Sequence, residues 1–155
     1  MSKQYAMKKF ILITCLIIGA INFAAAQNGS YALVEAKTVS SDIVRLRINV
    51  FCNDKQQIAT EAQCAAIRAV LFEGTGVPPY TKPLLSEGEQ TMKQSYPYYF
   101  DNLFSTRYSD FIRCYSAISK FKRSENKSTL YEVDVKILLL RKDLEKNRIK
   151  RQIGY

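Results

Sequence analysis

One stretch, residues 129–140, constrains the fold more than any other part of the 155-residue chain. It reads TLYEVDVKILLL, and apolar side chains from Tyr131 to Leu139 alternate with mostly charged ones. This period of two is typical of a strand with one buried face. Because the stretch is longer than most strands, we expect it to cross the middle of a sheet.

The N-terminal segment has the pattern of an export signal. A basic pair, Lys8-Lys9, precedes an apolar run that ends at Phe23 and is followed by the letters AAAQ. This pattern predicts a secretory signal peptide over residues 1–26, cleaved after Ala26, with translation starting at Met1 or Met7. An uncleaved anchor is the alternative, since the apolar run is close to the minimum length for spanning a bilayer.

The leader resembles those of exported Gram-negative proteins that end in AAAQ, and the resemblance covers the leader alone. It implies a periplasmic or outer-surface protein. We expect residues 27–155 to form a single domain, since a chain of this length fits one core.

Export would place the cysteines that follow the leader in an oxidising compartment. A Cys52–Cys64 bond would join a strand to the next helix, and a Cys64–Cys114 bond would tie that helix to a distant segment. The sequence does not choose between these pairs, and three free, buried thiols are the other alternative. The chain has no histidine and no cysteine spacing typical of zinc, so we expect no metal and no other cofactor.

Further elements follow from the same kinds of pattern. A helix over residues 56–73 is expected after a cap at Asn53-Asp54 and before Gly74. Strands are predicted over residues 42–52 and 115–123, and residues 31–36 are predicted as a short strand or an extended arm. A polar turn at 124–128, a helix over 141–147 and a basic edge strand over 148–155 complete the chain.

The predicted helix is apolar on two flanks, which is more than packing on one sheet requires. A face rich in alanine suits close packing on a sheet, while Cys64, Ile67 and Leu71 add a second apolar flank. We expect an insertion over residues 76–114 to cover this flank. A helix start near residues 86–89 and another at Pro97 predict that the insertion is partly helical.

The order of these elements predicts an α+β fold of the ferredoxin-like, split β-α-β type, with an antiparallel sheet and helices on one face. In that topology strand 42–52 lies beside strand 129–140. Arg45 and Arg47 would then face Glu132 and Asp134, a favourable cross-strand pairing of opposite charges. A different strand order is the alternative.

Two groups of residues are candidate contacts. The segment 96–115 is rich in aromatic side chains, which favours packing of the insertion on the core. A groove for a glycan or an extended peptide is the second hypothesis, and its contact residues would be Tyr80, Tyr96, Tyr98, Tyr99 and Tyr108. The basic C-terminal segment is typical of a solvated surface, but it could also contact anionic lipid or an acidic partner through Lys142, Lys146, Arg148, Lys150 and Arg151.

No catalytic constellation is present in the sequence. The absence of histidine excludes Ser-His-Asp and Cys-His machinery, and the acid pairs Glu87/Glu89 and Asp143/Glu145 have simple surface explanations. Nucleic acid is not an expected partner, because the exposed face of the predicted sheet offers Phe51 as its one aromatic ring. The sequence therefore favours an exported, non-catalytic binding or assembly module whose partner is another envelope protein. A glycan- or peptide-binding protein is the alternative.

Overall fold

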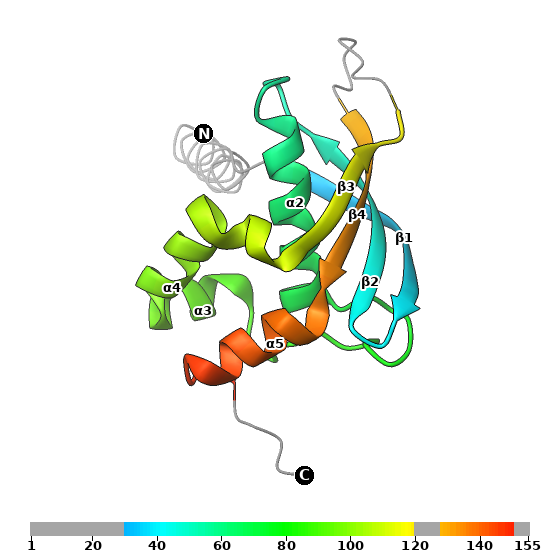
Figure 1. The fold of residues 1–155 in the computed structure, drawn as a ribbon. Helices are drawn as coiled ribbons and strands as arrows, with labels where there is room; N and C mark the ends of the chain where they lie inside the picture. Colours follow the sequence, from blue (N-terminus) through cyan, green and yellow to red (C-terminus); the bar gives the residue numbers. More distant parts are fainter. Residues whose placement is uncertain (1–29, 120–127, 151–155) are drawn as a thin grey trace, which may run out of the picture. The chain divides into compact units, whose positions relative to one another are not determined.

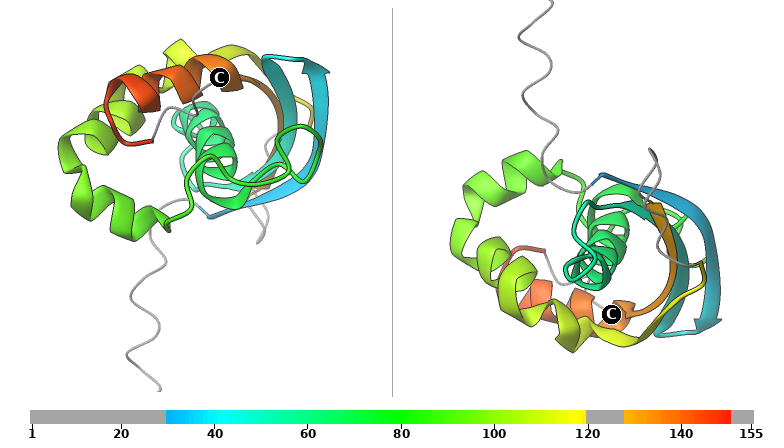
Figure 2. Two further views of the ribbon diagram at one scale, coloured as in Figure 1. Left: turned by 90° about the horizontal axis from the view of Figure 1, so that it is seen from below. Right: turned by 90° about the horizontal axis from the view of Figure 1, so that it is seen from above.

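The computed structural model of the chain describes residues 30–119 and 128–150. The predicted signal peptide, most of the predicted turn at 124–128, and Arg151 lie outside the described residues. The described residues form an α+β structure in which a four-stranded sheet curves around one helix (Figures 1 and 2). The α+β part of the fold prediction is therefore confirmed.

The sheet is antiparallel, with the strand order β1-β2-β4-β3. The bounds are Ser30–Ser40 for β1, Ile43–Phe51 for β2, Ile112–Ala117 for β3 and Ser128–Lys136 for β4. β4 is antiparallel to both of its neighbours. Consequently β2 and β3, which are joined through the helical part of the chain, run parallel to each other on either side of β4.

The predicted pairing of the two central strands is confirmed. β2 and β4 are antiparallel neighbours, and their register places Arg45 opposite Asp134 and Arg47 opposite Glu132. Both acidic side chains accept hydrogen bonds from the arginine opposite. The alternation of charged and apolar residues in both strands is therefore sufficient to identify their common buried face.

The outer neighbour of β2 differs from the prediction. In a complete ferredoxin-like sheet this position belongs to the C-terminal strand, predicted here over residues 148–155. β1 occupies it instead, and residues 148–150 form a turn and a bend. A two-residue turn, Ser41-Asp42, brings β1 beside β2 with almost no loop to close. The complete ferredoxin-like arrangement is thus not confirmed.

Two other boundaries are corrected by the structure. β4 ends at Lys136, and the next residues begin the helix α5, Ile137–Lys146, because Ile137, Leu140 and Leu144 are all buried with helical spacing. β3 begins at Ile112 rather than at residue 115, and an irregularity after Ile112 interrupts its alternation. A bulge of this kind shifts the sequence pattern by one residue.

The helix α2, Ile58–Arg68, continues as a π-helix over Ala69–Glu73 and ends at Gly74. It is buried on both of its apolar flanks, against the concave face of the sheet and against the helical insertion. The cap predicted at Asn53-Asp54 lies about one turn before the first residue of α2. There the Asp54 carboxylate accepts a hydrogen bond from the Gln56 N–H at 2.8 Å. α2 itself begins without a side-chain cap.

The insertion forms the second layer over α2, as predicted (Figure 2). It contains α3, Glu89–Ser95, and α4, Pro97–Asn102, followed by a π-helix over Leu103–Arg107 and a 3-10 turn over Tyr108–Phe111. The Phe100 ring is buried between Phe72 and Phe104, with ring centroids 5.9 and 6.3 Å away. The Cys64 thiol donates to the Phe104 carbonyl at 3.5 Å.

A candidate interaction surface on the open face of the sheet

The two faces of the sheet differ sharply in what covers them. The concave face holds Val44, Leu46 and Ile48 of β2 and Val133 of β4, all completely buried against α2. No described helix covers the convex face (Figures 1 and 2). We call this convex face the open face. An antiparallel sheet with one solvated face is common, so its side chains decide whether it has a function.

A chain of alternating charges crosses the open face from β1 to β3. We call it the charge ladder, and it consists in spatial order of Glu35, Arg47, Glu132, Arg45, Asp134 and Arg113. Successive ion pairs have N–O distances of 2.8, 3.2, 3.3 and 2.7 Å, and Arg113 forms the last one with Asp134. Each strand contributes at least one member, so the ladder joins all four strands on their solvent side.

Asp134 is the one ladder residue that is removed from water, with 1% of its side chain exposed. Burial opposes its ionisation, but hydrogen bonds from Arg45, Cys114 and Arg113 outweigh that effect and lower the pKa of Asp134 to about 2. Arg45 donates to it twice, at 2.7 and 3.1 Å, and the Cys114 thiol donates at 3.2 Å. The carboxylate is therefore ionised and saturated with donors.

A shallow hollow of about 130 Å³ lies over β1, β2 and β4 on the open face. It is lined by Glu35, Lys37, Arg45, Arg47 and Glu132. Lys37 is the lining residue that forms no ion pair among the described residues. The hollow is smaller than the usual pocket for a small ligand, so it suits a side chain that protrudes from a partner.

Exposed apolar side chains flank the ladder on the same sheet. Val34 and Val39 are exposed on β1, the strand that contributes Glu35 to the ladder. Phe51 is exposed at the end of β2, the strand of Arg45 and Arg47. Ile118 is also exposed, and its N–H donates to the Leu130 carbonyl at 2.8 Å. The open face thus combines fixed charges with exposed apolar groups, a composition found at protein interfaces.

The five candidate tyrosines do not gather in one cleft. The Tyr80 hydroxyl donates to the Ser41 carbonyl at 2.6 Å, and the Tyr99 hydroxyl donates to Asp143 at 2.7 Å. Burial, reinforced by the Asp143 carboxylate, raises the pKa of Tyr99. The Tyr108 hydroxyl lies 3.4 Å from that of Thr60, while Tyr96 and Tyr98 project into solvent. The hollow described above contains none of these five.

The candidate basic residues divide into two groups. Lys142, Lys146 and Arg148 are exposed and form no ion pair among residues 30–119 and 128–150. Lys150 is half-buried and donates to the Leu84 carbonyl, and burial lowers its pKa. Lys150 is therefore a structural contact in this structure rather than a free cation.

All three cysteines of the described residues are free thiols. Each one has a different hydrogen-bond partner: the Asp54 backbone for Cys52, the Phe104 carbonyl for Cys64 and the Asp134 carboxylate for Cys114. Burial raises the pKa of Cys64 to about 11. The thiols are unpaired in this structure, but the third alternative also expected them to be buried, and only Cys64 is: Cys52 is half-buried and Cys114 is exposed.

Three of the four acids considered for catalysis, Glu89, Asp143 and Glu145, are engaged in ion pairs. Glu89 binds Arg68 and Lys93, Asp143 binds Arg107, and Glu145 binds Arg141. Within the described part of the chain, no group of histidine, cysteine, aspartate or glutamate residues could hold a metal ion. Likewise, none of its helices has the length and apolar character needed to cross a bilayer.

Comparisons with family models, with curated proteins and with solved structures found no match to this chain. Sequence reasoning identified the four central ladder residues but missed Glu35 and Arg113. Glu35 sits at a break in the alternation of β1, and Arg113 sits at the irregular start of β3.

Proposed function

We propose that this protein is an exported, non-catalytic binding or assembly module of the cell envelope, and that the open face of its sheet contacts a protein partner. The observation that carries the proposal is the charge ladder. Its arginines are held in fixed positions by acids on neighbouring strands, and exposed apolar side chains lie on the same sheet.

Preorganisation makes such a surface suitable for specific recognition. A free surface arginine loses side-chain entropy when a partner fixes it, whereas Arg45 and Arg47 are already held between two strands. Arginine is also enriched at protein interfaces, where its stem and planar head both contribute contact area. The hollow beside Arg47 offers Lys37 as the one lining cation that is free to pair with an acidic side chain of a partner.

The alternative, a glycan- or peptide-binding groove made by the tyrosines, has less support. Stacking on a sugar or a peptide requires several rings in one concavity. Here Tyr80 and Tyr99 use their hydroxyls within the chain, and the hollow of the open face contains charged side chains instead. Tyr96 and Tyr98 are exposed, and neither lines the hollow.

We also propose that the segment from β2 to β4 is related to the ferredoxin-like arrangement. Two parallel strands with an antiparallel strand between them, and a helix in their connection, support this relation. In this proposal β1 replaces the usual last strand at the edge.

Site-specific photo-cross-linking in the producing cells tests the functional proposal. A benzophenone amino acid at Phe51 should give one discrete protein adduct, and the same group at Gln94, exposed on α3, should not. Lys37→Glu should weaken the Phe51 adduct, because it reverses a free charge at the hollow without breaking an ion pair. Lys82→Glu is the matched control and should leave the adduct unchanged. Equal adducts at Phe51 and Gln94, or none at Phe51, would refute the proposal.

A further inference from the structure

We infer that the outer surface of α4 and α5 binds the anionic head groups of a phospholipid bilayer. We call this surface the α4–α5 face and define it by Leu139, Lys142, Lys146, Arg148, Tyr96 and Tyr98. It is distinct from the open face of the sheet, and the inference does not depend on the function proposed for that face. Three observations carry it: the spacing of the cations, the state of the neighbouring acids and the exposure of the tyrosines.

The cations of α5 form one stripe along the helix. Leu139, Lys142 and Lys146 are spaced by three and four residues, so they lie on one side of α5, opposite the buried Ile137, Leu140 and Leu144. Arg148 lies two residues after the end of the helix and is also exposed. The stripe therefore presents three cations and one exposed leucine to solvent.

The acids of α5 do not neutralise this stripe. Asp143 is occupied by Arg107 at 2.8 Å and by the Tyr99 hydroxyl at 2.7 Å, both from the insertion. Glu145 is occupied by Arg141 at 2.9 Å. The positive charge of the stripe is thus left for an external anion, in contrast to the ladder, where every arginine has an acid beside it.

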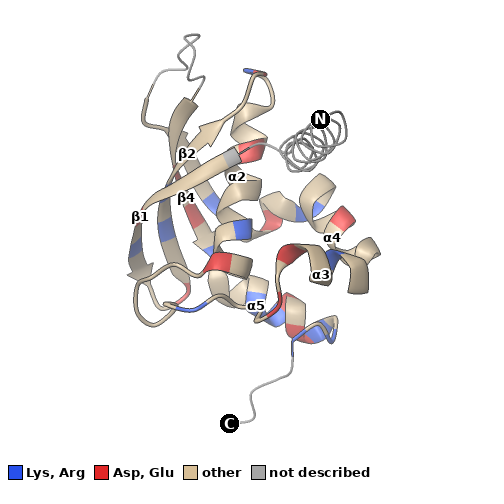
Figure 3. Ribbon diagram, turned by 180° about the vertical axis from the view of Figure 1, so that it is seen from behind, with Lys and Arg blue, Asp and Glu red and all other residues tan. Residues whose placement is uncertain are grey.

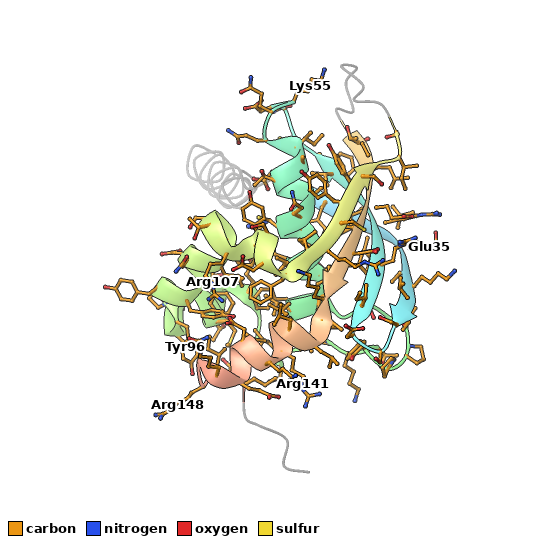
Figure 4. The ribbon with its side chains drawn as sticks, in the orientation of Figure 1. Glu35, Lys55, Tyr96, Arg107, Arg141 and Arg148 are labelled. Atoms are coloured by element: carbon orange, nitrogen blue, oxygen red, sulfur yellow. The ribbon has the colours of Figure 1, made fainter. Side chains whose placement is uncertain are left out.

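Two tyrosines at the start of α4, Tyr96 just before the helix and Tyr98 within it, extend the face beyond α5. The Tyr99–Asp143 and Arg107–Asp143 bonds hold the insertion against α5, and in the view of Figure 4 Tyr96 and Arg148 both lie at the lower left. Tyr98 is 91% exposed, the highest value among the large apolar and aromatic side chains of the described residues. One acid, Asp101, is exposed one turn after Tyr98, so the face keeps a net positive charge.

This combination fits a bilayer surface better than a rigid partner. Tyrosine places an apolar ring and a polar tip at the level of lipid head groups, and flexible lysines adapt to mobile phosphates. Basic residues next to exposed aromatic and leucine side chains are the features of interfacial binding. The hollow on the open face lies elsewhere and is lined by none of the residues of the α4–α5 face.

Vesicle co-sedimentation tests the inference, using the protein purified in the form that cells accumulate. Vesicles of phosphatidylglycerol and phosphatidylcholine in equal parts should bind it, and binding should fall as salt is raised. Vesicles of phosphatidylcholine alone should bind it much more weakly. Since each lysine near an anionic surface contributes about fivefold in affinity, Lys142→Gln/Lys146→Gln should weaken binding about 25-fold.

The matched control is Lys37→Gln/Lys55→Gln, which removes the same charge elsewhere. Lys37 lies on the sheet, and Lys55 lies at the opposite end of the molecule from Arg148 (Figure 4). This control should change binding by less than about twofold, because distant charges are screened at physiological salt. Equal losses in both double variants would overturn the inference and indicate an effect of overall charge.

A third variant separates a bilayer from other polyanions. Tyr98→Ser should weaken binding to the anionic vesicles but leave binding to soluble dextran sulfate unchanged, because the ring contributes only where there is an interface to enter. If the protein binds dextran sulfate but not the anionic vesicles, the partner is a soluble polyanion and the bilayer inference fails. If the neutral vesicles bind equally well, the cations have no role and the inference also fails.

Discussion

The substitution Asp134→Asn removes the one buried charge of the ladder while keeping the shape of the side chain. The amide cannot accept from Arg45, Arg113 and Cys114 as the carboxylate does, because one of its two polar atoms is itself a donor. We therefore expect the variant to fold and to have a lower free energy of unfolding at neutral pH.

The pH dependence of this stability difference follows from the pKa of Asp134. That pKa is about 2 in the folded protein, compared with 3.8 for an aspartate outside the fold. A lowered pKa stabilises the folded state where the group is ionised, so the contribution is complete above about pH 5 and is lost as the pH falls towards 2. This difference in pKa contributes about 2 kcal/mol to the free energy of unfolding at pH 7 and about 1 kcal/mol at pH 3. The stability gap between wild type and Asp134→Asn should therefore narrow by about 1 kcal/mol between these pH values.

Urea unfolding followed by far-UV circular dichroism measures this gap, since urea leaves electrostatic interactions unscreened. Each protein is unfolded at pH 7 and at pH 3. The other carboxylates titrate in both proteins, so their contribution cancels in the difference between the two free energies of unfolding. Glu132→Gln is the control on the exposed part of the same ladder and should lose no more than about 1 kcal/mol at pH 7. A gap for Asp134→Asn that is the same at both pH values would refute the account of Asp134 as a buried, ionised acceptor.

Three further outcomes are expected. Gly74→Ala should lower the free energy of unfolding by on the order of 2–4 kcal/mol, measurable by urea unfolding, because φ is +84° and a Cβ would lie 2.6 Å from the Thr81 carbonyl oxygen. Thr129→Val should leave the midpoint of thermal unfolding unchanged or raise it, because the buried Thr129 hydroxyl has no hydrogen-bond partner among residues 30–119 and 128–150. Under native conditions at pH 8, iodoacetamide should modify Cys114 and spare Cys64, as read by peptide mass spectrometry, since Cys64 is buried and burial raises its pKa to about 11.

The central pairing of the sheet could be predicted because two independent patterns agree. The alternation in residues 42–52 and 129–140 identifies the buried face, and the opposite charges on the other face set the register. The second cover of α2 was predictable for a similar reason, since its two apolar flanks require two packing partners.

The edges of the sheet were less predictable because their patterns are locally interrupted. In β1 both Val34 and Glu35 are exposed, so the alternation changes phase there and the strand appears shorter than it is. In β3 the irregularity after Ile112 has the same effect. The same interruptions explain why the candidate site was predicted only in part. Glu35 and Arg113 lie at them, and these are the two ladder residues that the sequence did not indicate.

The distribution of basic residues relates the two proposed surfaces to each other. On the sheet, Arg45, Arg47 and Arg113 are neutralised by acids on adjacent strands, whereas the cations on the exposed stripe of α5 are not. α3 and α4 lie on the far side of α2 from the sheet, and α5 runs from the end of β4 towards them (Figures 2 and 3). A bilayer bound at the α4–α5 face would therefore leave the open face directed away from the lipid. The two proposed contacts are sterically compatible in one molecule, so loss of vesicle binding in Lys142→Gln/Lys146→Gln should leave the Phe51 adduct intact in detergent extracts.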